Sequence, residues 1–167
     1  ESDLVLVATD HFHEILRDNA ASLRKTYFGV IDAGIRGSNI TCINFADEQA
    51  AFLAGAAAAL FTQGLQPKTD PSELAIGWLS GADIAAMRSM FNSYQEGAKL
   101  VVPAIRVIQG QAGSFTNTEQ ACLETQRLLQ QGVKVLVLAA GPSNGKVLEL
   151  AKQAGIYIIG LDTDYKK

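Results

Sequence analysis

Short apolar runs alternate along this chain with longer segments in which apolar residues recur at helical spacing. The runs of strand length are 3–8, 26–31, 40–45, 73–79, 106–109, 133–138 and 156–161. Helical patterns follow most of them. Strands that alternate with helices favour parallel sheets covered by helices. We therefore expect an α/β fold, with three strands before Pro71 and four after it.

The clearest strand–helix–strand unit spans residues 132–164. Its first strand ends in a turn of small residues at 139–145, where backbone can approach a ligand closely. The helix that follows has one apolar face, and Gly155 is placed to close it as a C-cap. Because ligands of parallel sheets bind beyond the carboxyl ends of strands, residues 141–144 and Asp162 are candidate ligand contacts.

The same residues also fit a purely structural interpretation. A turn with this composition can be only a connector, and an aspartate after a strand can be a helix cap or a solvated charge. If Asp162 does bind a ligand, its carboxylate suits a diol, a sugar or an amine. Residue pattern alone leaves both interpretations open.

The most linker-like stretch is 64–71, which is rich in Gly, Pro and polar residues. We place a domain boundary there, with residues 1–65 in a first lobe, 66–72 as the crossover and 73–167 in a second lobe. Two such lobes predict a ligand site between them.

Composition excludes several classes of function. The net charge is −3 and no basic cluster occurs, which argues against nucleic-acid partners and against binding to an anionic membrane surface. No apolar run has transmembrane length, and no signal peptide is present. Cys42 and Cys122 are expected as buried free thiols, with a disulfide as the minority alternative. Since the chain opens directly on a strand, we expect a missing segment before Glu1.

Signatures of catalysis are absent. The chain has no nucleophile elbow, zinc-protease, CxxC or phosphate-loop motif, and its two histidines, His11 and His13, lie on different helix faces. We therefore expect no enzyme activity, no metal and no cofactor. Phe91 and Tyr94 fall at helical spacing and are expected in the core.

Two local motifs are worth testing. Asn39-Ile40-Thr41 matches a glycosylation sequon, although such matches often arise by chance. Thr116 and Glu119 have the spacing of a capping box at the start of a helix.

Several collinear stretches together resemble one known family. They are YFGVID at 27–32, EQAAFLAG at 48–55, FNSYQEG at 91–97, GSF at 113–115, AAG at 139–141 and IGLDTD at 159–164. In this order and spacing they resemble the basic membrane protein family, which includes the purine nucleoside receptor lipoproteins. The resemblance spans most of the chain.

The resemblance implies a two-lobed periplasmic-binding-protein fold that holds a nucleoside in its cleft and delivers it to the permease of an ABC importer. It also implies an extracytoplasmic lipoprotein, held at the membrane only by a lipid anchor that this chain lacks. In the family, the aspartate matching Asp162 binds ribose hydroxyls. An aromatic residue that stacks on the base corresponds here to Val137, which cannot stack. The expected ligand-binding residues are Asp10, Phe115, Val137, Ala140, Gly141 and Asp162.

The resemblance also implies that the chain is an internal fragment, because family motifs expected before and after it are missing. Three alternatives remain open. Val137 in place of an aromatic motivates a regulatory or sensory module of the same fold with altered or lost ligand. A sugar-binding receptor is the second alternative, and a small α/β enzyme acting on nucleosides or sugars is the third.

Overall fold

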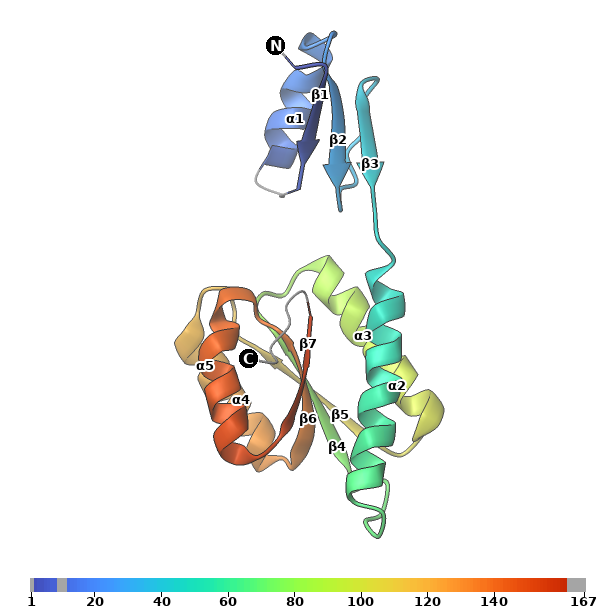
Figure 1. The fold of residues 1–167 in the computed structure, drawn as a ribbon, viewed down its shortest axis with the longest axis vertical. Helices are drawn as coiled ribbons and strands as arrows, with labels where there is room; N and C mark the ends of the chain where they lie inside the picture. The colour runs from blue at the N-terminus through green and yellow to red at the C-terminus, as the bar shows by residue number, and fades with distance from the viewer. Residues whose placement is uncertain (1, 9–11, 162–167) are drawn as a thin grey trace. The chain divides into compact units, whose positions relative to one another are not determined.

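The computed structural model describes residues 2–8 and 12–161, which form two compact units divided between Ala46 and Asp47 (Figure 1). Both units contain parallel sheets with flanking helices, so the predicted α/β fold is confirmed. The division lies about twenty residues before the predicted 66–72 crossover, which the structure places inside the second unit.

The first unit, residues 1–46, is a three-stranded parallel sheet in the order β1 (Leu4–Val7), β2 (Tyr27–Ile31) and β3 (Ile40–Ile43). Helix α1 (His13–Asn19) and the short 3-10 helix η2 (Ala20–Ser22) follow β1. Within α1, Leu16 is the buried apolar residue. Phe12, Ile15 and Leu23 are each about half exposed, and Leu23 lies beyond the helix because α1 ends at Asn19.

Asn39 holds the loops of the first unit together. Its side-chain Nδ2 donates hydrogen bonds to the carbonyl oxygens of Ala20 (2.8 Å), Leu23 (3.2 Å) and Thr26 (2.9 Å), and the residue is 8% exposed. The nitrogen that a glycan would modify is therefore buried and fully engaged. In the folded chain, the asparagine of this sequon therefore has a structural role: its side chain satisfies buried backbone carbonyls.

The second unit, residues 47–167, is built on a four-stranded parallel sheet with helices on both faces (Figure 1). The strand order is β5 (Arg106–Gln111), β4 (Ala75–Ser80), β6 (Val133–Ala139) and β7 (Tyr157–Gly160). Helices α2 (Asp47–Leu65) and α3 (Ala85–Val101) cover one face. Helices α4 (Thr118–Gln130) and α5 (Asn144–Ala154) cover the other.

Helix α2 belongs to the second unit because its backbone packs directly against that of α3. A Cβ added to Gly55 would overlap the carbonyl oxygen of Tyr94, and one added to Gly97 would overlap that of Phe52. The two glycines therefore let the helices approach more closely than any side chain would allow. The small inner face of α2 then reaches the core around Trp78. This packing is the physical reason that the division precedes α2.

The aromatic residues of α3 lie in that core, as predicted. Trp78 and Tyr94 are fully buried, with ring centroids 5.4 Å apart, and Phe91 packs beside them. The Tyr94 hydroxyl donates to the Gly77 carbonyl at 3.2 Å. Burial raises the pKa of Tyr94, so it remains a neutral donor.

The predicted crossover residues form the connection from α2 to β4. The Asp70 carboxylate accepts hydrogen bonds from the Ser72 hydroxyl (2.6 Å) and the Ser72 backbone N–H (2.8 Å). These bonds lower the pKa of Asp70. The segment is thus a closed turn that returns the chain from a helix to the sheet that this helix covers.

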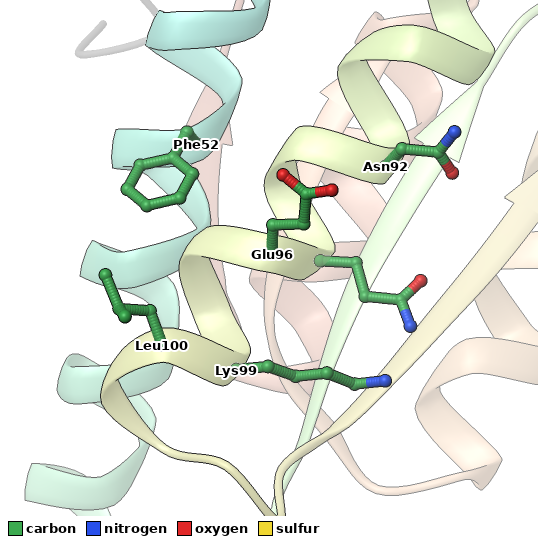
Figure 2. Close-up of a pocket in the computed structure, with 6 residues that line it drawn as sticks. Phe52, Asn92, Glu96, Lys99 and Leu100 are labelled. Atoms are coloured by element: carbon green, nitrogen blue, oxygen red, sulfur yellow. The ribbon is translucent and has the colours of Figure 1, made fainter.

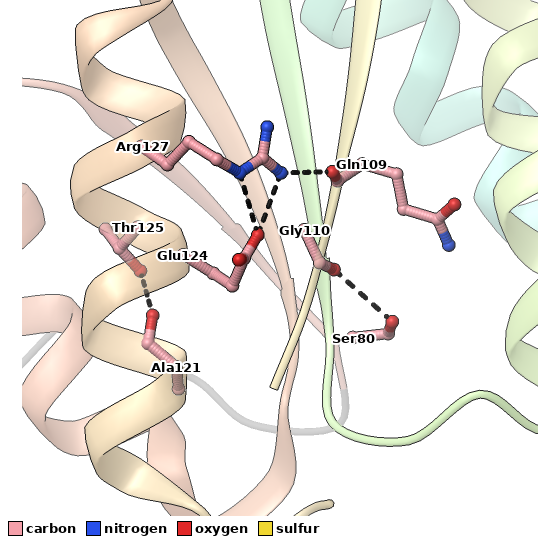
Figure 3. Close-up of polar contacts among 7 residues, drawn as sticks. All are labelled: Ser80, Gln109, Gly110, Ala121, Glu124, Thr125 and Arg127. Atoms are coloured by element: carbon pink, nitrogen blue, oxygen red, sulfur yellow. Dashed lines mark hydrogen bonds and ion pairs between the residues drawn. The ribbon is translucent and has the colours of Figure 1, made fainter. Parts of the chain in front are cut away.

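Arg127 of α4 anchors the helix to β5 and also forms a half-buried ion pair within the helix. The Arg127 guanidinium contacts the Glu124 carboxylate at 2.8 Å and donates to the Gln109 carbonyl at 2.6 Å (Figure 3). The helix begins at a different cap from the one predicted. The Asn117 side chain accepts from the Gln120 N–H at 3.1 Å, and the Thr116–Glu119 capping box does not form.

Candidate ligand site at the carboxyl edge of the second sheet

The loops after β4, β5 and β6 leave the second sheet at its carboxyl edge, where they are joined by backbone hydrogen bonds. The Gly81 N–H donates to the Ala139 carbonyl at 3.0 Å, and the Ala112 N–H donates to the Ser80 carbonyl at 2.9 Å. Strand pairing therefore continues to the last residue of each strand. The loops start from fixed positions, as a preformed site requires.

Phe115, in the loop after β5, lies between two glycines from the other loops. A Cβ on Gly81 would come within 2.8 Å of the Phe115 Cα and would overlap the ring. Gly141, after β6, has a left-handed φ of 59°, and a Cβ at this position would lie 3.4 Å from the Phe115 side chain. Gly81 therefore makes room for this phenylalanine, which is half-buried, whereas position 141 favours glycine because of its left-handed backbone.

Ser143 connects the loop after β6 to the loop after β5. Its hydroxyl donates to the Phe115 carbonyl at 3.1 Å and lies 3.5 Å from the Thr118 hydroxyl. Ser143 is fully buried, so these bonds hold the backbone of Phe115 in place from the protein interior.

Ala140 and Gly141 differ in what they can offer a ligand. The Ala140 N–H donates to the Asn144 side-chain oxygen at 3.2 Å, its carbonyl accepts from the Ser143 N–H at 3.3 Å, and the residue is fully buried. Gly141 is exposed. Of this predicted pair, Gly141 is the one whose backbone a ligand can reach.

Val137 lies within β6, two residues before the end of the strand. Its side chain is fully buried in the core cluster that contains Trp78. In this structure Val137 contributes packing beneath the edge. Asp10 and Asp162, the two predicted carboxylates, lie outside the described residues. Strand β7, which precedes Asp162 in the sequence, runs parallel to β6 and ends at the same edge.

The described part of the edge is largely neutral. Its components are an aromatic ring, exposed backbone at Gly141 and small side chains. The nearby Asp83–Arg88 pair, at 2.8 Å, is solvent-exposed on both sides and contributes little to stability. A ring beside backbone donors and acceptors suits a flat, neutral ligand with polar edges.

Sequence reasoning missed Gly81, which shapes this edge, and named Ser143 and Asn144 only as members of the candidate segment 141–144. Gly81 carried a usable signal, because it follows an apolar strand in a run of small residues. Ser143 carried no signal beyond its place in a turn, since its role depends on contacts with Phe115 and Thr118. Asn144 acts within the same turn, where its side chain accepts from the Ala140 N–H.

A second concavity lies on the outer side of α2 and α3. This open groove of about 670 Å³ is lined by Phe52 of α2 and by residues of α3, including Glu96 and Leu100 (Figure 2). It contains none of the predicted ligand-binding residues. Its walls are side chains of two helices, without the converging loops found at the carboxyl edge.

Several other features bear on function. Among the described residues, no group of His, Cys, Asp and Glu side chains could hold a metal ion. In that same part of the chain, no helix combines the length and the apolar character needed to cross a membrane. Cys42 and Cys122 are free thiols and half-buried.

Solved structures with the same fold include solute-binding proteins. One, from an ABC transporter system of Aeropyrum pernix K1, superposes with a TM-score of 0.78 at 23% identity, covering 96% of this chain and 45% of that one. A transcriptional activator of the comK gene from Bacillus halodurans has a TM-score of 0.76 at 19% identity, covering 95% and 51%. At these identities the likeness shows the fold alone.

Sequence relatives are more informative. Basic membrane protein D of Borreliella burgdorferi is 32% identical over 138 residues, which are 81% of this chain and 38% of that protein. The ABC transporter nucleoside-binding protein BmpA of Lactococcus lactis is 30% identical over 149 residues, 84% of this chain and 40% of that protein. The chain therefore spans about two fifths of the length of these relatives.

The model of one protein family matches the chain from residue 1 to residue 167. Its description is ABC transporter substrate-binding protein, PnrA-like, and it agrees with the motifs, the parallel sheets and the curated relatives. This chain belongs to the Bmp family of PnrA-like substrate-binding proteins of ABC transporters.

Proposed function

We propose that this chain is part of a receptor that binds a purine nucleoside outside the cytoplasm and presents it to the permease of an ABC importer. The observation that carries the proposal is the convergence of Gly81, Phe115 and Gly141 at the carboxyl edge of the second sheet. The name of the Lactococcus lactis relative, a nucleoside-binding protein, supports the choice of ligand class.

Each proposed contact has a physical role. The ring of Phe115 lies against the flat base, which gains from stacking and from apolar burial. The exposed backbone at Gly141 approaches the ligand without a side chain to block it. Asp162 accepts hydrogen bonds from two ribose hydroxyls, and its charge strengthens both of them. Ala140 and Val137 support the edge from the interior.

The test is calorimetric titration of the full-length protein with guanosine, inosine, adenosine, cytidine and ribose. We expect purine nucleosides to bind more tightly than cytidine and ribose. Asp162→Asn should weaken binding about 10- to 100-fold, the loss expected for hydrogen bonds to a charged acceptor. Asp70→Asn is the matched control, because Asp70 bonds only within its own turn, and it should leave affinity unchanged.

Two results would overturn the proposal. Equal binding of ribose and of every nucleoside would identify a sugar receptor. Absence of binding by a folded protein would favour a second candidate, a regulatory module of the same fold that has lost its ligand. The observation behind this candidate is Val137, which is aliphatic and buried where the resemblance places an aromatic residue.

A further inference from the structure

Helix α2 carries a second apolar face, opposite the one that packs against α3 and the sheet. We call it the outer stripe: Ala50, Leu53, Ala57, Leu60 and Gly64. All five residues are exposed, with Leu53 at 67% and Leu60 at 53%. A helix that is apolar on all sides is normally buried on all sides. Within the part of the chain that the structure describes, the outer stripe therefore lacks a partner.

The spacing of the outer stripe specifies what kind of partner fits it. Its members are separated alternately by three and four residues, which is the period of helix-to-helix packing. Leucine alternates with a small residue along the whole stripe. No ionisable residue occurs between Gln49 and Leu65, so neither charge repulsion nor loss of charge hydration opposes close contact with another helix.

The outer stripe is also complementary to the outer stripe of a second copy that runs in the opposite direction. In an antiparallel pair of α2 helices, Leu53 lies opposite Gly64 of the other copy, and Ala57 lies opposite Leu60. Each layer then contains one leucine and one small residue, so that every knob has a hole. A two-fold axis uses the same patch on both copies, as isologous dimers do. We propose that a second copy of this chain packs its α2 against the outer stripe.

Neighbouring features favour this arrangement. A groove of about 410 Å³, lined by Phe52, Leu53 and Ser93 among others, borders the stripe and can receive side chains of the second copy. The antiparallel orientation also brings the acidic first turn of one α2, at Asp47 and Glu48, to the end of the other, which Lys68 follows. Opposed helix dipoles and opposite charges both favour that orientation.

The expected dimer is weak. A helix of 19 residues is roughly 28 Å long, and one helix pair covers less than a standard protein interface. We therefore expect a monomer–dimer equilibrium with a dissociation constant of micromolar order. This inference is independent of the proposed ligand.

Sedimentation over a concentration series tests the proposal directly. The full-length protein should double its mass as concentration rises. Leu60→Glu should remain monomeric over the same range, because it buries a charge against the other copy. Leu123→Glu is the matched control: Leu123, on α4, is 52% exposed against 53% for Leu60, and its replacement should leave the dimer intact. A wild-type monomer at every concentration, or equal disruption by both variants, overturns the proposal.

Cross-linking tests the orientation. In a Cys42→Ser, Cys122→Ser background, Ala57→Cys places both thiols close to the two-fold axis, and a short thiol cross-linker should join them. Ala50→Cys places the two thiols roughly 25 Å apart at opposite ends of the pair, beyond that reach. Cross-linking of Ala57→Cys alone supports the antiparallel pair, whereas equal cross-linking of both variants contradicts it.

Discussion

At the scale of single residues, Gly55 and Gly97 let two helices of the second unit pack backbone against backbone. Each one faces a backbone carbonyl of the opposite helix, at a distance that admits no side chain. A flexible side chain could move aside for a methyl group, but a carbonyl inside a helix cannot do so without breaking its own hydrogen bond. The contact between α2 and α3 therefore depends on both glycines.

We predict that Gly55→Ala destabilises the protein by about 3 kcal/mol, the upper part of the range for overpacking a core. Chemical denaturation followed by circular dichroism measures this loss. Gly64→Ala is the control on the same helix, because a Cβ there meets nothing within 4 Å. It should stabilise by about 0.5–1 kcal/mol through helix propensity. Similar effects of the two variants would show that the close approach is not what Gly55 provides.

The sequence could not reveal these roles of glycine. In the sequence, Gly55 is one small residue among many on one face of a helix. Which atom lies opposite depends on the crossing point with α3, about forty positions later. Gly155 was different, since its place after a periodic helix predicted a C-cap, and the structure confirms it with a φ of 65°.

At the scale of elements, α4 is capped by Asn117, one residue after the Thr116 that the capping-box motif indicated. Asn117→Ala should cost about 1 kcal/mol, because it removes the side-chain acceptor for the Gln120 N–H. Thr116→Ala, at the position that the sequence motif indicated, should cost less than half as much. Thermal unfolding of the two variants, compared with the wild type, measures the difference, and a larger loss from Thr116→Ala would restore the capping box.

Most elements could be predicted because hydrophobic periodicity is a local property. Each strand from β1 to β7 occurs where an apolar run ends in small or acidic residues, with shifts of one or two positions at its ends. Local pattern does not identify the partner of an element. Helix α2 precedes a linker-like stretch, and only its contact with α3 shows which unit it joins.

At the scale of the whole molecule, the position of the division can be tested by truncation. A chain of residues 47–167 retains both helices over the core around Trp78 and should unfold cooperatively. A chain of residues 73–167 lacks α2, which exposes buried residues such as Ile76 and Tyr94, and we expect it to aggregate or to melt without cooperativity. Calorimetry of both chains decides the matter. Cooperative melting of the shorter chain would favour the predicted crossover at 66–72.

The candidate site was predictable in its location and less so in its composition. Parallel strands place their loops at one edge, which pointed to Gly141 from the sequence, whereas Phe115 was expected only from the family resemblance. Burial then distinguishes residues that the family motifs could not tell apart. Ala140 and Val137 belong to the interior, whereas Gly141 is exposed. Ligand roles for Asp10 and Asp162 stay predictions.

The single tryptophan of the chain, Trp78, has one more consequence. It is buried beside Tyr94 and Phe91 in the second unit, and the first unit contains no tryptophan. Intrinsic fluorescence excited at the red edge of absorption therefore reports on the second unit alone. Its emission should shift to longer wavelength when that unit opens to water, while unfolding of the three-stranded sheet leaves the signal unchanged.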